Sequence, residues 1–193
     1  PLLTVQSPPE AEQAARQALD LLLRRAGMEV EAGHFDGVKT ALSPFAGKGN
    51  HRVDAMLAFA LTGLGETLEA ARLLLTAGLS APDDGRHPAF ELVALFGRLN
   101  RRDEALDVLK AATGITPYDT HVLDALGDLL CHLGRYDDAL KILDKALEIR
   151  PVSPRTLNFK AIALMERGDI DEAEGIFRRV LELVPDNASA LSN

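Results

Sequence analysis

Cysteine is nearly absent from this chain of 193 residues, since Cys131 is the only one. One cysteine cannot form a disulfide within the chain, so packing must hold the fold together. Long apolar runs are also missing. The three leucines at 21–23 are followed at once by Arg24 and Arg25, and no run approaches the roughly 18 apolar residues that suggest a membrane span. The sequence therefore predicts no membrane insertion.

Basic residues are scarce relative to acidic ones. Lysine and arginine total 21 against 29 aspartates and glutamates, which gives a formal net charge of −8. A general nucleic-acid surface needs clustered lysine and arginine to displace phosphate counterions, and docking on anionic membranes needs the same charge. The acidic excess therefore argues against both classes of partner.

The usual motifs of catalysis and metal binding are missing as well. There is no glycine-rich phosphate loop, zinc motif or serine nucleophile motif. Cys131 and His132 are adjacent, and neighbours on a helix point apart, so a Cys/His nucleophile pair is not supported. The sequence predicts no enzyme, no catalytic residue, no metal site and no cofactor.

A repeat of 34 residues is present instead. Pro117, Pro151 and Pro185 share this spacing, as do Ala105, Ala139 and Ala173, and Asn100, Gly134 and Gly168. Gly65, Ala70 and Pro82 carry the same internal spacing after one inserted residue, which we place near Gly85. Repeats of this length are typical of helical arrays. The predicted array covers 51–193, with full units at 51–84, 86–119, 120–153 and 154–187 and the start of a fifth at 188–193.

The pattern within each unit resembles the tetratricopeptide repeat. The unit 120–153 fits best, with Leu123, Leu126, Gly127, Leu130, Ala139, Leu143, Ala146 and Pro151 at family positions. Two other units depart from the pattern: Lys160 stands at position 7 of its unit, and Asp54 at position 4 of the first. The resemblance implies an all-α, right-handed superhelical solenoid of antiparallel helix pairs. The first helix of each pair, helix A, would line the concave face, and helix B the convex face.

Physical reasons support the same reading. Small residues at positions 8 and 20 let the two helices approach closely. Position 15 ends helix A and favours a left-handed backbone, which suits Gly65, Asn100, Gly134 and Gly168. Ser153 and Pro154 read as an N-cap followed by proline at the first helical position.

Residues 1–50 are helical in pattern but lie off the repeat consensus. Ser7 and Glu10 resemble a capping box, Gly33 to Phe35 breaks the helical pattern, and residues 46–50 form a flexible connection by composition. We expect a degenerate N-terminal helix pair or cap. The chain begins with Pro1 and has no signal-peptide pattern. A cytoplasmic location is favoured, and a periplasmic one requires that a signal was removed.

The family resemblance implies a protein-protein interaction scaffold that binds an extended peptide or helix in its concave groove. One alternative is a self-assembling module that forms homo-oligomers through the exposed end of the array. Another is the non-catalytic arm of a longer enzyme, for example a transferase, with the catalytic or a membrane domain elsewhere.

In this family, positions 2, 5, 9, 12 and 13 of helix A point into the groove. The predicted groove residues are Arg52, Phe59, His87, Phe90, His121, Asp124, Asp128, Arg155, Asn158 and Ile162. The same columns also hold Arg98 and His132 at position 13.

Three hypotheses attach to these columns. The basic or titratable residues at position 2 would receive acidic groups of a peptide, or they are ordinary solvated residues. The aromatic rings of Phe59 and Phe90, with Ile162, would anchor a ligand or pack against the next helix. Asp124 and Asp128 would be solvated or partner-binding. The carboxylate clamp of chaperone-binding relatives is not matched, because Asn158 alone has a clamp residue type.

Overall fold

The computed structural model describes residues 9–79, 87–186 and 191. These residues form ten α-helices and one short 3-10 helix, with no strand among them. The helices are α1 (Pro9–Glu31), α2 (Phe35–Leu42), η1 (Ser43–Phe45), α3 (His51–Gly63), α4 (Thr67–Gly78), α5 (Pro88–Arg98), α6 (Arg102–Ile115), α7 (Thr120–His132), α8 (Tyr136–Ile149), α9 (Pro154–Arg167) and α10 (Ile170–Leu183).

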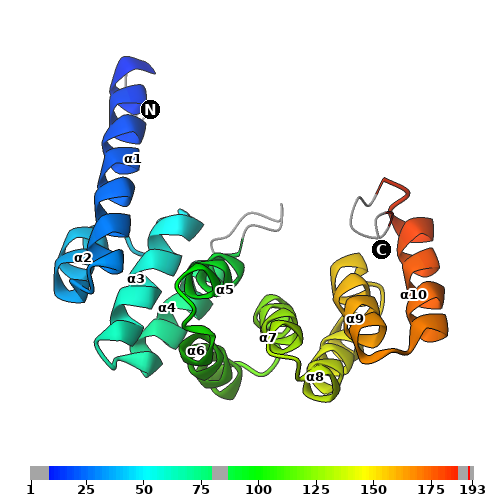
Figure 1. Ribbon diagram of the computed structural model, residues 1–193. Helices are drawn as coiled ribbons and strands as arrows, with labels where there is room; N and C mark the ends of the chain where they lie inside the picture. The colour runs from blue at the N-terminus through cyan, green and yellow to red at the C-terminus, as the bar shows by residue number, and fades with distance from the viewer. Residues whose placement is uncertain (1–8, 80–86, 187–190, 192–193) are drawn as a thin grey trace.

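Neighbouring helices pack in pairs to form a curved array (Figure 1). Helices α5, α7 and α9 lie on the inner side of the curve, and α6, α8 and α10 lie on the outer side. Helix α1 stands at one end of the array and α10 at the other. The predicted all-α solenoid of helix pairs is therefore confirmed.

The turns between paired helices have the predicted left-handed residue. The φ angles are 81° at Gly65, 55° at Asn100, 70° at Gly134 and 103° at Gly168. Asn100 is the only non-glycine residue with positive φ in the described parts of the chain. Asparagine tolerates this conformation better than other side chains, so it replaces glycine at the end of α5.

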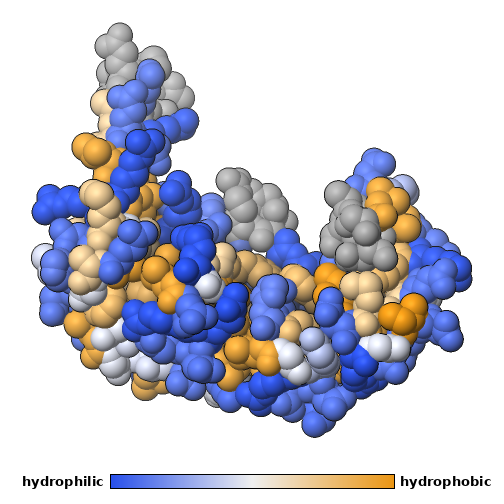
Figure 2. Space-filling view, viewed as in Figure 1, coloured by the Kyte–Doolittle hydropathy of each residue, from blue (hydrophilic) through white to orange (hydrophobic). Residues whose placement is uncertain are grey.

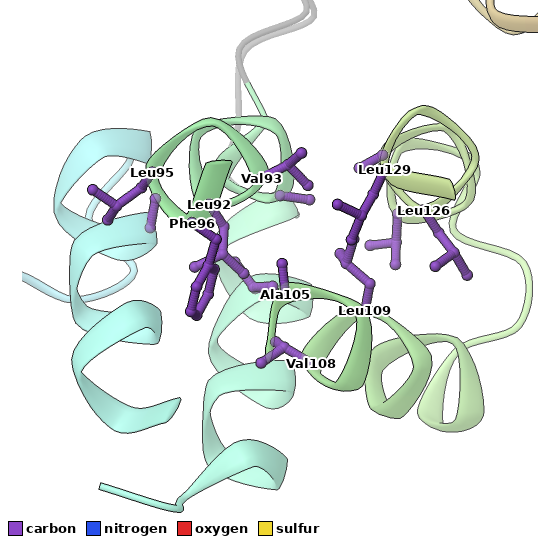
Figure 3. Close-up of a cluster of buried hydrophobic side chains, with 14 of the residues drawn as sticks. Leu92, Val93, Leu95, Phe96, Ala105, Val108, Leu109, Leu126 and Leu129 are labelled. Carbon is purple, nitrogen blue, oxygen red and sulfur yellow. The ribbon is translucent and has the colours of Figure 1, made fainter. Parts of the chain in front are cut away.

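Close helix crossing depends on a missing side chain at one position of the best-fitting unit. A Cβ atom added at Gly127 of α7 would lie 2.6 Å from Leu143 Cδ2 of α8. Buried side chains from successive helices then form one continuous core (Figure 3). Phe96 of α5, Leu109 of α6 and Leu129 of α7 are fully buried members of it.

Both departures from the consensus have local structural roles. The carboxylate of Asp54 is buried and accepts a hydrogen bond of 2.7 Å from the backbone N–H of Gly47, which ties the 46–50 connection to α3. Lys160 of α9 forms a 2.7 Å ion pair with Asp144 of α8. A polar contact between helices thus replaces the apolar contact expected at this position.

Ser153 caps α9 as predicted, since its side chain accepts a hydrogen bond from the Thr156 N–H and proline occupies the first turn. The predicted capping residue Ser7 and the insertion near Gly85 lie outside the described residues. Of the predicted fifth unit at 188–193, only Leu191 is described.

The first junction of the array differs from the later ones. Helix α5 packs mainly on α3, and α6 packs on α4. Further along, an outer helix packs on the next inner helix, α6 on α7 and α8 on α9. The face of α3 that would line a groove is therefore covered by α5.

Candidate functional site on the concave face

The concave side of α5, α7 and α9 carries apolar side chains flanked by hydrophilic ones (Figure 2). It divides into two regions. The first turns of the three helices form a closed half, in which side chains cover one another. The later turns of α5 and α7 form an open pocket.

An aromatic bridge closes the first half. The rings of Phe90 on α5 and Phe159 on α9 are stacked, with centroids 6.0 Å apart and an interplanar angle of 20°. The guanidinium of Arg155 lies 5.0 Å from the Phe90 ring centroid, a favourable cation–π distance. Because α7 lies between α5 and α9 along the chain, these contacts link next-but-one units across the groove.

Asp124 of α7 is buried in the closed half. Only 2% of its surface is exposed. Burial raises the pKa of its carboxyl to about 6, although a hydrogen bond from Thr156 and the positive charges of Arg155 and Arg150 lower it in part. The expectation of a solvated Asp124 is wrong, because the inner helices approach so closely that water is excluded from the first turn of α7.

Two histidines pack beside this carboxylate region. The rings of His87 and His121 are stacked with centroids 5.2 Å apart. His87 is 2% exposed, and its Nδ1 accepts a 3.2 Å hydrogen bond from the backbone N–H of Ala89, which caps α5. Burial lowers the pKa of His87 to about 4; nearby Asp119 raises it, and His121 and Arg155 lower it further. His87 is therefore neutral at neutral pH, and it does not present a positive charge to a ligand.

The open pocket lies between the later turns of α5 and α7 and has a volume of about 410 Å³. Its lining residues come from α5, the start of α6, and α7: Phe90, Val93, Ala94, Gly97, Arg98, Arg102, Asp128 and His132. Phe90 thus has two roles, since it belongs to the bridge and also borders the pocket.

The charged groups of the open pocket differ in their surroundings. His132 Nε2 lies 3.7 Å from Asp128 Oδ1. Burial raises the pKa of Asp128, and the charge of His132 lowers it. The guanidinium of Arg102 lies at the end of α5, 3.8 Å from the place that a Cβ of Gly97 would take. Arg102 therefore lies within van der Waals distance of the end of α5.

Phe59 is not a groove residue, so its interpretation as an anchor is wrong. It is fully buried, and its ring centroid lies 4.3 Å from that of Phe96 and 6.0 Å from that of Phe35. The Arg101 guanidinium lies 5.0 Å from the same centroid. The cause is the packing of α5 on α3.

The remaining predicted residues are distributed along the array. Asn158 is buried in the closed half, whereas His121, Arg155, Asp128 and Ile162 are partly exposed. Arg52 is exposed at the start of α3. The predicted basic row is interrupted because His87 is buried within it.

Sequence reasoning left several pocket and bridge residues out of the predicted set. Arg98 and His132 were detectable, because both stand at position 13, a groove column. Phe159 stands at position 6 and Arg102 belongs to a B helix, so the groove columns indicated neither. Their positions depend on the curvature of the array and on the turn after α5.

No cluster of three or more potential metal ligands occurs among the described residues. Within the same residues, no helix combines the length and apolarity that crossing a membrane requires.

The sequence pattern of the tetratricopeptide repeat family matches residues 98–163 and 133–193. This chain is a tetratricopeptide repeat protein. The array resembles the crystal structure of YrrB, described as a tetratricopeptide repeat protein with an unusual peptide-binding site, with a TM-score of 0.51 and 15% identity over 89% of each chain. It also resembles the first such domain of human RPAP3, with a TM-score of 0.50 and 20% identity over 54% of this chain and 82% of that domain. Among curated proteins, no matching relative was found.

Proposed function

We propose that this tetratricopeptide repeat protein is a non-catalytic interaction scaffold that holds an extended peptide or a helix on its concave face. The observation that carries the proposal is the open pocket between α5 and α7. It is concave, it has an apolar wall of Phe90, Val93 and Ala94, and it has polar groups at its margin. This composition is typical of sites that bind a ligand.

The construction of the pocket also favours binding. Its walls are side chains on packed helices, and the aromatic bridge links α5 to α9 next to it. A groove that is formed before the ligand arrives requires little further ordering, so more of the contact energy remains for affinity. The peptide-binding site of YrrB supports the proposal by analogy of fold.

A selection from a random peptide library tests this function, using wild-type protein and an Ala94→Trp variant. Ala94 is exposed in the pocket wall, so tryptophan there should occupy the pocket without disturbing the core. The matched control is Ala15→Trp, at an exposed position of α1. We expect peptides that bind the wild type and the control but not Ala94→Trp. Enrichment of no such peptide would contradict the proposal.

Self-association is a second candidate, favoured by a different observation. Exposed apolar side chains recur at the ends of outer helices and in the turns that follow: Ile115, Tyr118, Ile149, Val152 and Leu183. They hold equivalent places in successive units, and apolar side chains exposed together on one face can form an interface. Solution mass measured over a wide concentration range tests this candidate. A mass that rises with concentration in the wild type, and stays monomeric in a Tyr118→Lys/Val152→Lys variant, would support it, and a constant monomer mass would exclude it.

A further inference from the structure

Two arginines, Arg98 and Arg102, line the open pocket. Neither Arg98 nor Arg102 forms an ion pair or a side-chain hydrogen bond with any described residue. Some other arginines of the array do have such partners. Arg101 binds Glu104, and Arg135 binds Asp138. In a chain whose formal net charge is −8, two arginines that pair with no described carboxylate therefore lie at one pocket.

The single carboxylate of the pocket does not neutralise these arginines. Asp128 lies 3.7 Å from His132 on its own helix, and no contact with either arginine is found within ion-pair distance. The pocket therefore combines an apolar wall on α5 with two arginines that have no ion pair among the described residues, and with one carboxylate beside His132.

The aromatic bridge limits which part of the groove a ligand can reach. Phe90, Phe159 and Arg155 cover the first turns of the inner helices, and Asp124 beneath them is almost completely buried. A segment bound in the open pocket therefore contacts the later turns of α5 and α7, together with Arg102 at the start of α6.

We propose that the open pocket recognises a peptide segment of a partner protein in which a large apolar residue is flanked by acidic residues. This inference rests on the proposed function and specifies its ligand. The apolar side chain lies against Phe90, Val93 and Ala94, where burial from water stabilises it. The flanking carboxylates bind the guanidinium groups of Arg98 and Arg102, whose planar forks match carboxylate geometry.

Three synthetic peptides test the inference by fluorescence anisotropy. The first has a central leucine flanked by glutamates, the second has lysines in place of the glutamates, and the third has serine in place of the leucine. We expect the first peptide to bind the wild type at least about tenfold more tightly than the other two, a difference of roughly 1.4 kcal/mol. Its affinity should also fall as salt rises, because ions screen exposed charges.

Charge reversal in the pocket supplies the decisive variant. Arg98→Glu/Arg102→Glu should weaken binding of the glutamate–leucine peptide at least about tenfold and should favour the lysine–leucine peptide instead. The control, Arg16→Glu/Arg24→Glu, makes the same change in net charge at exposed positions of α1 and should leave both affinities unchanged. Equal weakening by the control would show a general charge effect and would overturn the inference.

The Ala94→Trp variant separates failure of this inference from failure of the proposed function. If library peptides bind in a manner that Ala94→Trp blocks, but the acidic peptide gains nothing from Arg98 and Arg102, the scaffold function stands and the acidic ligand is wrong. If the wild type binds none of the three peptides, the acidic ligand is likewise wrong. If Ala94→Trp blocks no binding at all, both proposals are wrong.

Discussion

The closed half and the open pocket of the concave face adjoin at Phe90 and lie on the same inner helices, yet they have opposite characters. In the closed half, Phe90 and Phe159 meet across α7, and Asp124 is 2% exposed. In the open pocket, Ala94 is exposed and the two arginines have no carboxylate partner among the described residues. The comparison shows that a groove position in a repeat does not guarantee access to solvent, because side chains from next-but-one units can cover it.

Removing the aromatic bridge should have the largest effect on stability. Phe90→Ala and Phe159→Ala remove half-buried rings, so each should lower the free energy of unfolding by about 1–2 kcal/mol, less than the cost at a fully buried ring. The double variant should lose less than the sum, because stacked rings are coupled by about 0.5–1.5 kcal/mol. Urea unfolding followed by circular dichroism measures all three values.

The control for the bridge is Ile162→Ala, which alters a half-buried residue of α9 outside the bridge. It should show no coupling to Phe90→Ala. If the double variant loses as much free energy of unfolding as Phe90→Ala and Phe159→Ala together, the two rings are not coupled and the bridge does not hold the closed half together.

Asp124→Asn should stabilise the protein by about 1 kcal/mol at pH 7.5, because a pKa raised by desolvation reflects a destabilised charged form. The folded-state pKa of about 6 lies above the ordinary value of 3.8. Folding therefore takes up a proton between these values, and the wild type gains stability from this group as pH falls through that window. The advantage of asparagine should shrink below pH 6 and vanish below pH 3.8. Denaturant unfolding at several pH values measures it.

His87 has the opposite dependence, since its lowered pKa of about 4 makes stability fall as pH decreases from 6.5 to 4. The wild type and the Asp124→Asn variant both contain His87, so its contribution largely cancels in the difference between their free energies of unfolding. The control is Asp138→Asn, where the hydrogen bond from Arg135 lowers the carboxyl pKa. That change should destabilise at neutral pH, with a loss that disappears in acid. A stability difference at Asp124 that is independent of pH would contradict its burial as an anion.

The smallest effect is expected in the open pocket. Arg98→Ser/Arg102→Ser should change the free energy of unfolding by less than about 0.5 kcal/mol, because neither side chain has an ion pair or hydrogen bond with a described residue to lose. The neighbouring Arg101→Ser is the matched control. Arg101 binds Glu104 and lies 5.3 Å from Phe35 and 5.0 Å from Phe59, so its loss should cost about 1–2 kcal/mol. Equal losses in both variants would show that the pocket arginines are structural.

The helices and turns could be predicted from the sequence because they depend on local chemistry. Proline after each outer helix prevents its continuation, and Gly134, Gly168 and Asn100 supply left-handed turns. Gly127 permits a close crossing because its hydrogen leaves the space that Leu143 fills. Each of these effects acts within one unit of 34 residues, so the spacing in the sequence contains it.

Access to the groove was decided by the tertiary structure. Phe59 and Ile162 hold the same repeat position, yet Phe59 is fully buried beneath α5, whereas Ile162 is partly exposed. Phe90 and Phe159 meet only because the array curves enough to bring α5 and α9 together. Curvature accumulates from small rotations between successive units, and these rotations depend on packing between helices that no single repeat encodes. For that reason the sequence alone determined an array of helix pairs, and the packing of units determined which part of its concave face is open to a ligand.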